Sequence, residues 1–272
     1  MLGIILVLIS INLVVADAPN FQLVEVDHSN GYATVTIPEN AIEIAPGIFS
    51  LGTTIDIDGT ILEGYAIVDY KKGFHHRQGH NGGSSEASST CFSFLAAGAK
   101  WKIVENYLVD SSNSVGLDQN FIRTNIAADI QEWENAAVRN IFGVEGNGSV
   151  NRGSIGNAMN GQNEVIFGNI ASPGAIAVTY VWGIFSGPPS RRELREWDQI
   201  YDQVDFTWNN NGDPNAMDFE NIAQHELGHS FGLGHPSDTC IEETMYRFAS
   251  EGETKKRDLN VGDISGIRRL YA

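Results

Sequence analysis

The sequence of 272 residues is short of positive charge, with 17 lysine and arginine residues against 34 aspartate and glutamate residues. The formal net charge of −17 repels phosphate groups, so it argues against nucleic acid or an anionic membrane as a partner. The acidity fits either a solvated surface that keeps the chain soluble or a supply of oxygen ligands for calcium. Of these two interpretations we favour the solvated surface.

Beyond its N-terminus, the sequence lacks any apolar run of the roughly 20 residues that a membrane span requires. Residues 1–16 are mostly apolar, and Ala16 and Ala18 offer small residues for cleavage. This pattern predicts a secretory signal peptide at 1–16 and a secreted, extracellular chain without stable membrane association after its removal. The segment has no lysine or arginine, so the alternative is an uncleaved anchor on the outer face of the membrane.

Cysteine is also scarce, because the chain has only Cys91 and Cys240. Two cysteines in an exported chain predict a single disulfide bond. Neither has the spacing from the histidines that a structural zinc site with cysteine ligands requires.

The most informative stretch of the sequence begins at His225. His225 and His229 are four residues apart, so on an α-helix they share one face and can bind one Zn²⁺. Glu226 lies about 100° further round the helix. A carboxylate in that place is beside the metal and can take a proton from water, so we predict that Glu226 is the catalytic general base.

A third histidine, His235, follows six residues after His229. A continued helix would carry it away from the metal, so the chain must turn between the two. Gly232 supplies this turn, because glycine tolerates positive φ at the end of a helix. Three histidine ligands leave the fourth tetrahedral position for water, which is typical of a catalytic zinc site.

Met245 follows ten residues after His235, and the complete pattern resembles that of the metzincin metalloproteases, with their methionine turn beneath the metal. Within that group the chain resembles the secreted microbial matrixin-like (peptidase M10-like) proteases. The segments that carry this resemblance are 219–224, which looks like the start of the active-site helix, and 263–271, which looks like the C-terminal helix. The sequence departs from animal matrixins at Pro236 and Arg247, where those usually carry serine and proline.

The resemblance covers 91–272 and implies an α+β fold with a twisted mixed sheet, long helices and a small, loop-rich lower subdomain. It also implies Zn²⁺ on His225, His229 and His235, a structural role for Met245, and calcium as a further ion. Polypeptide substrates and a monomeric chain are expected. A strand at the edge of the cleft pairs with extended substrate in this family, and we assign that part to 175–182.

The cysteines have two interpretations in the light of this resemblance. A Cys91–Cys240 bridge would fix the start of the catalytic region beside the floor of the site. Alternatively, Cys91 could act as a latency switch by providing a fourth zinc ligand. The sequence around Cys91 lacks the proline, arginine and glycine pattern that animal matrixins use for that switch, so the bridge is preferred.

Four regions are expected: the signal peptide at 1–16, a β-rich N-terminal or pro-segment at 17–70, a Gly/Ser/His linker at 71–90 and the catalytic domain at 91–272. Within the last, alternation and helical periodicity predict the following elements: strands at 101–110, 163–167, 175–182 and 200–208, and helices at 118–142, 191–196, 216–231 and 261–270.

These features predict a zinc-dependent, zymogen-type metalloendopeptidase. Two other functions compete with it. A zinc hydrolase of a non-protein amide would use the same residues, and a secreted binding protein could retain a vestigial zinc site. The presence of Glu226 argues against the binding protein, because binding alone does not need a general base.

Overall fold

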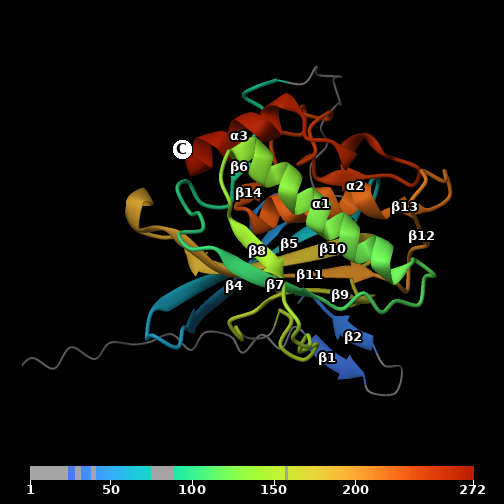
Figure 1. The fold of residues 1–272 in the computed structure, drawn as a ribbon, viewed down its shortest axis with the longest axis horizontal. Helices are drawn as coiled ribbons and strands as arrows, with labels where there is room; N and C mark the ends of the chain where they lie inside the picture. Colours follow the sequence, from blue (N-terminus) through green and yellow to red (C-terminus); the bar gives the residue numbers. More distant parts are fainter. Residues whose placement is uncertain (1–23, 28–31, 38–40, 75–87, 157–158) are drawn as a thin grey trace, which may run out of the picture.

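The computed structural model describes residues 24–27, 32–37, 41–74, 88–156 and 159–272. The predicted signal peptide and most of the predicted linker fall outside these residues. The described chain has the expected α+β class, with three α-helices on one side of a large mixed sheet (Figure 1). None of the described helices is long and apolar enough to cross a membrane.

The main sheet has 11 strands, and most of them follow one path in the order β1-β2-β9-β11-β10-β5-β4-β3. β9 and β11 are parallel, whereas β10 is antiparallel to both of its neighbours, β11 and β5. β7 lies parallel to β9 and to β8. The bounds of these strands are Val24–Asp27 (β1), Tyr32–Val35 (β2), Ile42–Ala45 (β3), Ile48–Ile55 (β4), Ile61–Lys71 (β5), Glu105–Val109 (β7), Phe142–Glu145 (β8), Asn163–Ile170 (β9), Ala175–Ile184 (β10) and Glu193–Asp202 (β11).

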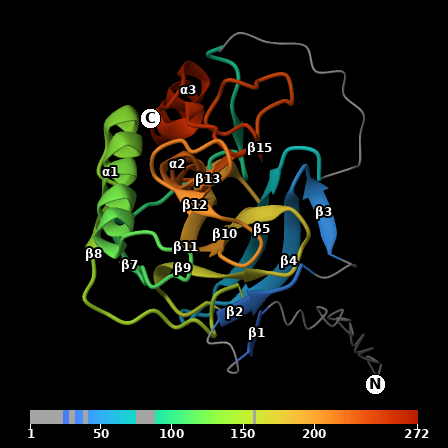
Figure 2. The same ribbon diagram turned by 90° about the vertical axis from the view of Figure 1, so that its right-hand side faces the viewer.

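The helices pack against one face of this sheet and against each other. They are α1 (Gln119–Ala137), α2 (Phe219–Ser230) and α3 (Val261–Tyr271). Figure 2 shows α1 and β3 at opposite ends of the molecule, with α2 between them above β10 and β11. The eleventh strand of the main sheet is β15 (Phe248–Ala249), which pairs with β5. Four short strands form two separate pairs: β6 (Ser93–Phe94) with β14 (Leu233–Gly234), and β12 (Trp208–Asn209) with β13 (Met217–Asp218).

The main sheet has an apolar core on each of its two faces. The larger core lies between the sheet and the helices and contains Trp133, Trp197 and Phe231, all fully buried. The smaller core covers the other face of the sheet and contains Val68, Val178 and Ile200. Both cores include side chains of β5, so β5 is buried on its two faces, as expected of an interior strand.

The N-terminal segment is β-rich, as expected, and its strands extend the same sheet as the later strands. Residues 61–71 form the longest strand of the described chain and pair with β10 along most of its length. The hairpin of β4 and β5 therefore continues the main sheet and is not a separate layer. The assignment of this region as a pro-segment stays a prediction.

The predicted helix at 118–142 begins where expected but is shorter. Asp118 is the N-cap, and its carboxylate accepts the Phe121 N–H at 2.8 Å. The helix ends at Ala137 because Val138 adopts a left-handed conformation, with φ 54°. Ile141 follows the apolar spacing of the helix and is buried, but it lies after the helix in the turn that leads to β8.

Three other predictions were wrong in detail. The surface helix at 191–196 is replaced by a 3-10 turn (Pro189–Arg191) and the start of β11, in which Leu194 and Glu196 are buried on alternate positions. The strand predicted at 200–208 therefore begins at Glu193 and ends at Asp202. The strand predicted at 101–110 begins at Glu105, and Ile103 before it is exposed.

Candidate metal centre

Helix α2 places the first two histidines of the motif. Asp218 caps it, because its carboxylate accepts the Asn221 N–H at 3.1 Å, and the helix ends at Ser230. The helix is buried almost all round, and His225 and His229 lie one turn apart with no exposed surface. Gly232 then makes the predicted turn with φ 103° and sends the chain back into β14.

The three imidazoles are oriented by backbone carbonyls. The Nδ1 atoms of His225, His229 and His235 lie 2.6, 2.9 and 2.9 Å from the carbonyl oxygens of Thr244, Leu233 and Pro46. A carbonyl oxygen can only accept a hydrogen bond, so each Nδ1 carries the proton and each Nε2 presents a lone pair. Hydrogen bonds of this kind fix the tautomer and direction of metal-binding histidines.

The Nε2 atoms converge on one point. His225 Nε2 and His229 Nε2 are 3.1 Å apart, and the three ligand atoms all lie within 4.8 Å of one another. Two lone pairs facing each other at this distance need a cation between them. Two nitrogens on a tetrahedral Zn²⁺ are about 3.3 Å apart. The donor set and its spacing therefore fit zinc.

Burial also favours the protonation state that binds metal. It lowers the pKa of His229 to about 3 and lowers the pKa values of His225 and His235 well below the usual range. All three imidazoles are therefore neutral at pH 7, as metal ligation requires. His235 Nε2 has no hydrogen-bond partner among the described residues, which agrees with a nitrogen that awaits a ligand.

Glu226 lies beside the histidines and is held by β10. The Thr179 hydroxyl donates a hydrogen bond to Glu226 Oε2, while Oε1 has no partner in the described part of the chain. Burial, and then the negative charge of Asp69, raise the pKa of Glu226 well above the ordinary value. One oxygen is thus fixed by Thr179. A cation held by the histidines would offset this rise in pKa and favour the carboxylate, the form that can accept a proton.

Met245 lies beneath the helix that carries the histidines, and its side chain is buried. Its backbone N–H and that of Thr244 donate to the Asp263 carboxylate at 3.1 and 2.7 Å. These bonds tie the methionine turn to the start of α3. The Thr244 carbonyl of the same turn accepts the His225 Nδ1–H, so the turn also orients a predicted ligand.

The two cysteines form a disulfide bond between Cys91 and Cys240. It joins the start of the 91–272 region to the segment between His235 and Met245. Since the sulfur of Cys91 is bonded in this structure, it does not act as a metal ligand here.

The sequence missed three residues that contact the predicted site: Pro46, Asp69 and Thr179. Asp69 Oδ1 lies 3.6 Å from His225 Nε2, and both side chains are fully buried. A signal for Asp69 was present, because a carboxylate inside the apolar run 66–70 is rarely buried without a partner. The sequence gives no such signal for Pro46 and Thr179. A backbone carbonyl or a hydroxyl on a strand is common everywhere in a chain, and only the tertiary structure brings these two to the site.

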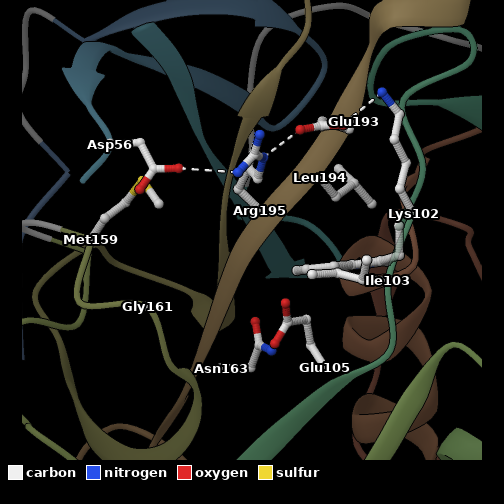
Figure 3. Close-up of a pocket in the computed structure, with 11 residues that line it drawn as sticks. Asp56, Lys102, Ile103, Glu105, Met159, Gly161, Asn163, Glu193, Leu194 and Arg195 are labelled. Carbon is white, nitrogen blue, oxygen red and sulfur yellow. Dashed lines mark hydrogen bonds and ion pairs between the residues drawn. The ribbon is translucent and has the colours of Figure 1, made fainter. Parts of the chain in front are cut away.

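One hollow in the described structure lies away from the three histidines. It has a volume of about 390 Å³ and is lined by residues from the β4–β5 turn, the segment before β7 and the start of β11 (Figure 3). Arg195 crosses it to reach Asp56 at 3.3 Å and Asp58 at 3.6 Å. None of the three histidines lines it, so we regard it as a junction between the N-terminal hairpin and β11.

Comparison with known proteins bears on the same part of the chain. Residues 190–272, which hold all three histidines, Glu226 and Met245, match the matrixin family of peptidase M10. Over this region the chain is matrixin-like. The mixed sheet and three helices agree with a metzincin-type α+β fold in a matrixin-like protein.

Individual matrixin relatives align over short stretches. Metalloendoproteinase 1-MMP of Arabidopsis thaliana is 44% identical over 57 residues, 21% of this chain and 15% of that protein. Metalloendoproteinase 1 of Glycine max is 46% identical over 56 residues, 21% of this chain and 17% of that protein. Human matrilysin is 41% identical over 56 residues, 21% of this chain and 20% of that protein. The alignments thus span a fifth or less of these relatives, and the likeness to microbial forms stays a prediction.

Calcium, the other expected ion, has no support in the described residues. Among the described histidine, cysteine, aspartate and glutamate side chains, the groups of three or more that could hold a metal ion are the three histidines and a second set formed by Asp69, His225 and Glu226. The second set adjoins the first and shares His225 with it.

Proposed function

We propose that this chain is a secreted zinc metalloendopeptidase that hydrolyses peptide bonds in polypeptides. The observation that carries the proposal is the convergence of three neutral Nε2 lone pairs, each set by an Nδ1–H bond to a carbonyl. His225, His229 and His235 would hold the metal. The names of the matrixin relatives support endoproteolysis.

The chain's own residues account for proton transfer. When bound, zinc would act as a Lewis acid that activates water and stabilises negative charge on the substrate carbonyl oxygen. Glu226, adjacent to His225 and held by Thr179, accepts the proton of the attacking water through its unpartnered Oε1. It then passes the proton to the leaving amine. Met245 supports the helix and does not take part in proton transfer.

Secretion rests on two observations of different kinds. The apolar segment 1–16 predicts a signal peptide, and the Cys91–Cys240 disulfide suits an oxidising compartment outside the cytosol. We also propose that residues 17–70 are a pro-segment of a zymogen and that the mature chain is a monomer. N-terminal sequencing of the exported protein would show whether 1–16 is removed.

The activity is tested by digestion of an unfolded protein, using the full chain and the same chain after limited proteolysis between 71 and 90. Matched controls are Glu226→Gln and a zinc chelator. We expect one zinc per chain in the parent and in Glu226→Gln, with turnover in Glu226→Gln lower by about 10²- to 10⁴-fold. Full turnover in Glu226→Gln, or turnover that survives removal of zinc, would refute the proposal.

A further inference from the structure

The edge of β10 that was expected to receive substrate is already paired. β5 lies antiparallel to β10 from the Ala175–Tyr70 pair to the Gly183–Glu63 pair. Away from β10, β5 pairs with β4 from Ile61 to Ile67. Only the end of β5 pairs with β15, where Phe248 is opposite Tyr70, just after the methionine turn. β5 therefore runs through the site as an extended chain between two strands, which is how a substrate bound by β-strand addition would lie.

Asp69 of β5 lies beside the predicted metal ligands. Its side chain is fully buried, Oδ1 lies 3.6 Å from His225 Nε2, and one of its oxygens is within 4.8 Å of both His225 and Glu226. Neither oxygen has a hydrogen-bond partner among the described residues. A buried carboxylate without such partners is costly unless it faces a cation. The Lys256 ammonium donates to the Tyr246 carbonyl and favours the charged form of Asp69 without a hydrogen bond to it, whereas a cation held by the histidines would contact Asp69 directly.

A second contact comes from the turn between β3 and β4. The Pro46 carbonyl accepts the His235 Nδ1–H at 2.9 Å, so this N-terminal segment orients one of the three predicted ligands. Gly47 has φ 73°, and a Cβ there would lie 3.2 Å from His235 Cε1 and 3.0 Å from the Val68 carbonyl oxygen. Glycine thus allows the turn to fit closely between β5 and the site.

From these contacts we infer that β5 is an internal pseudosubstrate and that Asp69 is the fourth protein ligand of the metal. The inference rests on the proposed zinc site. A carboxylate in that position takes the place of the water that Glu226 must deprotonate, and β5 takes the place of the polypeptide. The described structure is then the latent form, and the segment before Lys72 must leave β10 before substrate can bind.

The assignment differs from the cysteine switch considered from the sequence. Cys91 is held in the disulfide, whereas Asp69 offers an oxygen ligand from a strand that is already paired with β10. Two further acidic residues of the same hairpin, Asp56 and Asp58, lie at its distant turn, 3.3 and 3.6 Å from the Arg195 guanidinium. Figure 3 shows the Asp56 contact. They provide a matched control for the loss of one negative charge in this segment.

The experiment uses the full chain with Co²⁺ in place of zinc, because the visible spectrum of Co²⁺ reports its ligands. Parent, Asp69→Asn and Asp58→Asn are compared before and after addition of acetohydroxamate, a small metal-binding probe. We expect the parent and Asp58→Asn to keep their spectra. Asp69→Asn should start with a different spectrum and change on adding the probe, and it should release zinc to a chelator at least about 10-fold faster.

The outcomes separate the two proposals. If the parent binds one Co²⁺ and responds to acetohydroxamate as Asp69→Asn does, the fourth-ligand assignment is overturned while the zinc site stands. If no variant binds Co²⁺ with a fixed stoichiometry, the proposed function itself fails. Thermal unfolding of each variant confirms that it is folded, and Asp69→Ser replaces Asp69→Asn if the amide prevents folding.

Discussion

The Met245 sulfur occupies the space into which a Cβ on Gly228 would project. Gly228 is one of the two residues between Glu226 and His229, so the absence of a side chain there lets the methionine turn touch the helix directly below the metal ligands. Trp133 of α1 lies against the same position, 2.8 Å from that Cβ. The motif therefore needs glycine for packing as well as histidine for chemistry.

Gly228→Ala should lower the free energy of unfolding by about 1–3 kcal/mol, because the added methyl group overpacks the contact with Met245. Urea denaturation of the metal-free chain measures this loss without a contribution from zinc binding. The double variant Gly228→Ala/Met245→Ala provides the control, because the smaller side chain makes room. The double variant should lose less free energy of unfolding than the two single variants lose together. If the two losses simply add, the side chains at 228 and 245 do not interact, and the proposed contact is wrong.

Thr179→Val should slow peptide hydrolysis by roughly 10- to 100-fold, the effect of losing a hydrogen bond to a charged group. Valine has nearly the same shape, but it leaves Glu226 Oε2 without its donor. Zinc content should stay at one per chain, since the described hydrogen bonds of the Thr179 hydroxyl go to Glu226. Thr179→Ser retains the hydroxyl and should retain most of the rate. Equal turnover in the valine variant and the parent would show that Thr179 does not position the base.

Three buried carboxyls on β9 and β11 make stability depend on pH. Burial raises the pKa of Glu196 to about 7 and raises the pKa values of Glu164 and Asp198, with mutual repulsion adding to the effect on Glu196 and Asp198. A carboxyl with a raised pKa binds its proton more tightly in the folded chain. The free energy of unfolding should therefore fall as pH rises from about 4 through about 7.

Glu196→Gln should flatten that fall, because the neutral amide keeps acceptor capacity for the Asn160 and Gly161 N–H groups without a charge to bury. Urea denaturation of the parent and of Glu196→Gln at pH 5 and pH 7 measures how far the free energy of unfolding falls with pH in each. Glu105→Gln, at a partly exposed carboxylate on β7, serves as the control and should keep the slope of the parent. A parallel pH dependence in parent and Glu196→Gln would contradict the argument.

Loss of the disulfide should destabilise the chain. The bond closes a loop with a sequence separation of 149, and removal of such a bond typically costs about 2–5 kcal/mol. The variant Cys91→Ser/Cys240→Ser should unfold at a lower urea concentration than the parent. Non-reducing peptide mapping of the parent should recover the two cysteine peptides joined, and two free thiols would disprove the bridge.

The sequence alone determined the parts of the site that are local in the chain. The spacing of His225 and His229 follows from the helical repeat, and the turn at Gly232 follows from the need for positive φ. The short range of these effects also explains the errors. Ile141 matches the apolar stripe of α1, but a left-handed residue at Val138 ends the helix before it.

Tertiary structure decided what occupies the site. In the sequence, 61–71 is one of several segments with the pattern of a β-strand, and nothing in its own residues selects β10 as its neighbour. That choice depends on burying Val68 and Ile67 in two cores, each of which includes residues more than a hundred positions later. Strand register is set by such distant contacts. For this reason the sequence predicted the three histidines, while only the fold placed Asp69 beside them.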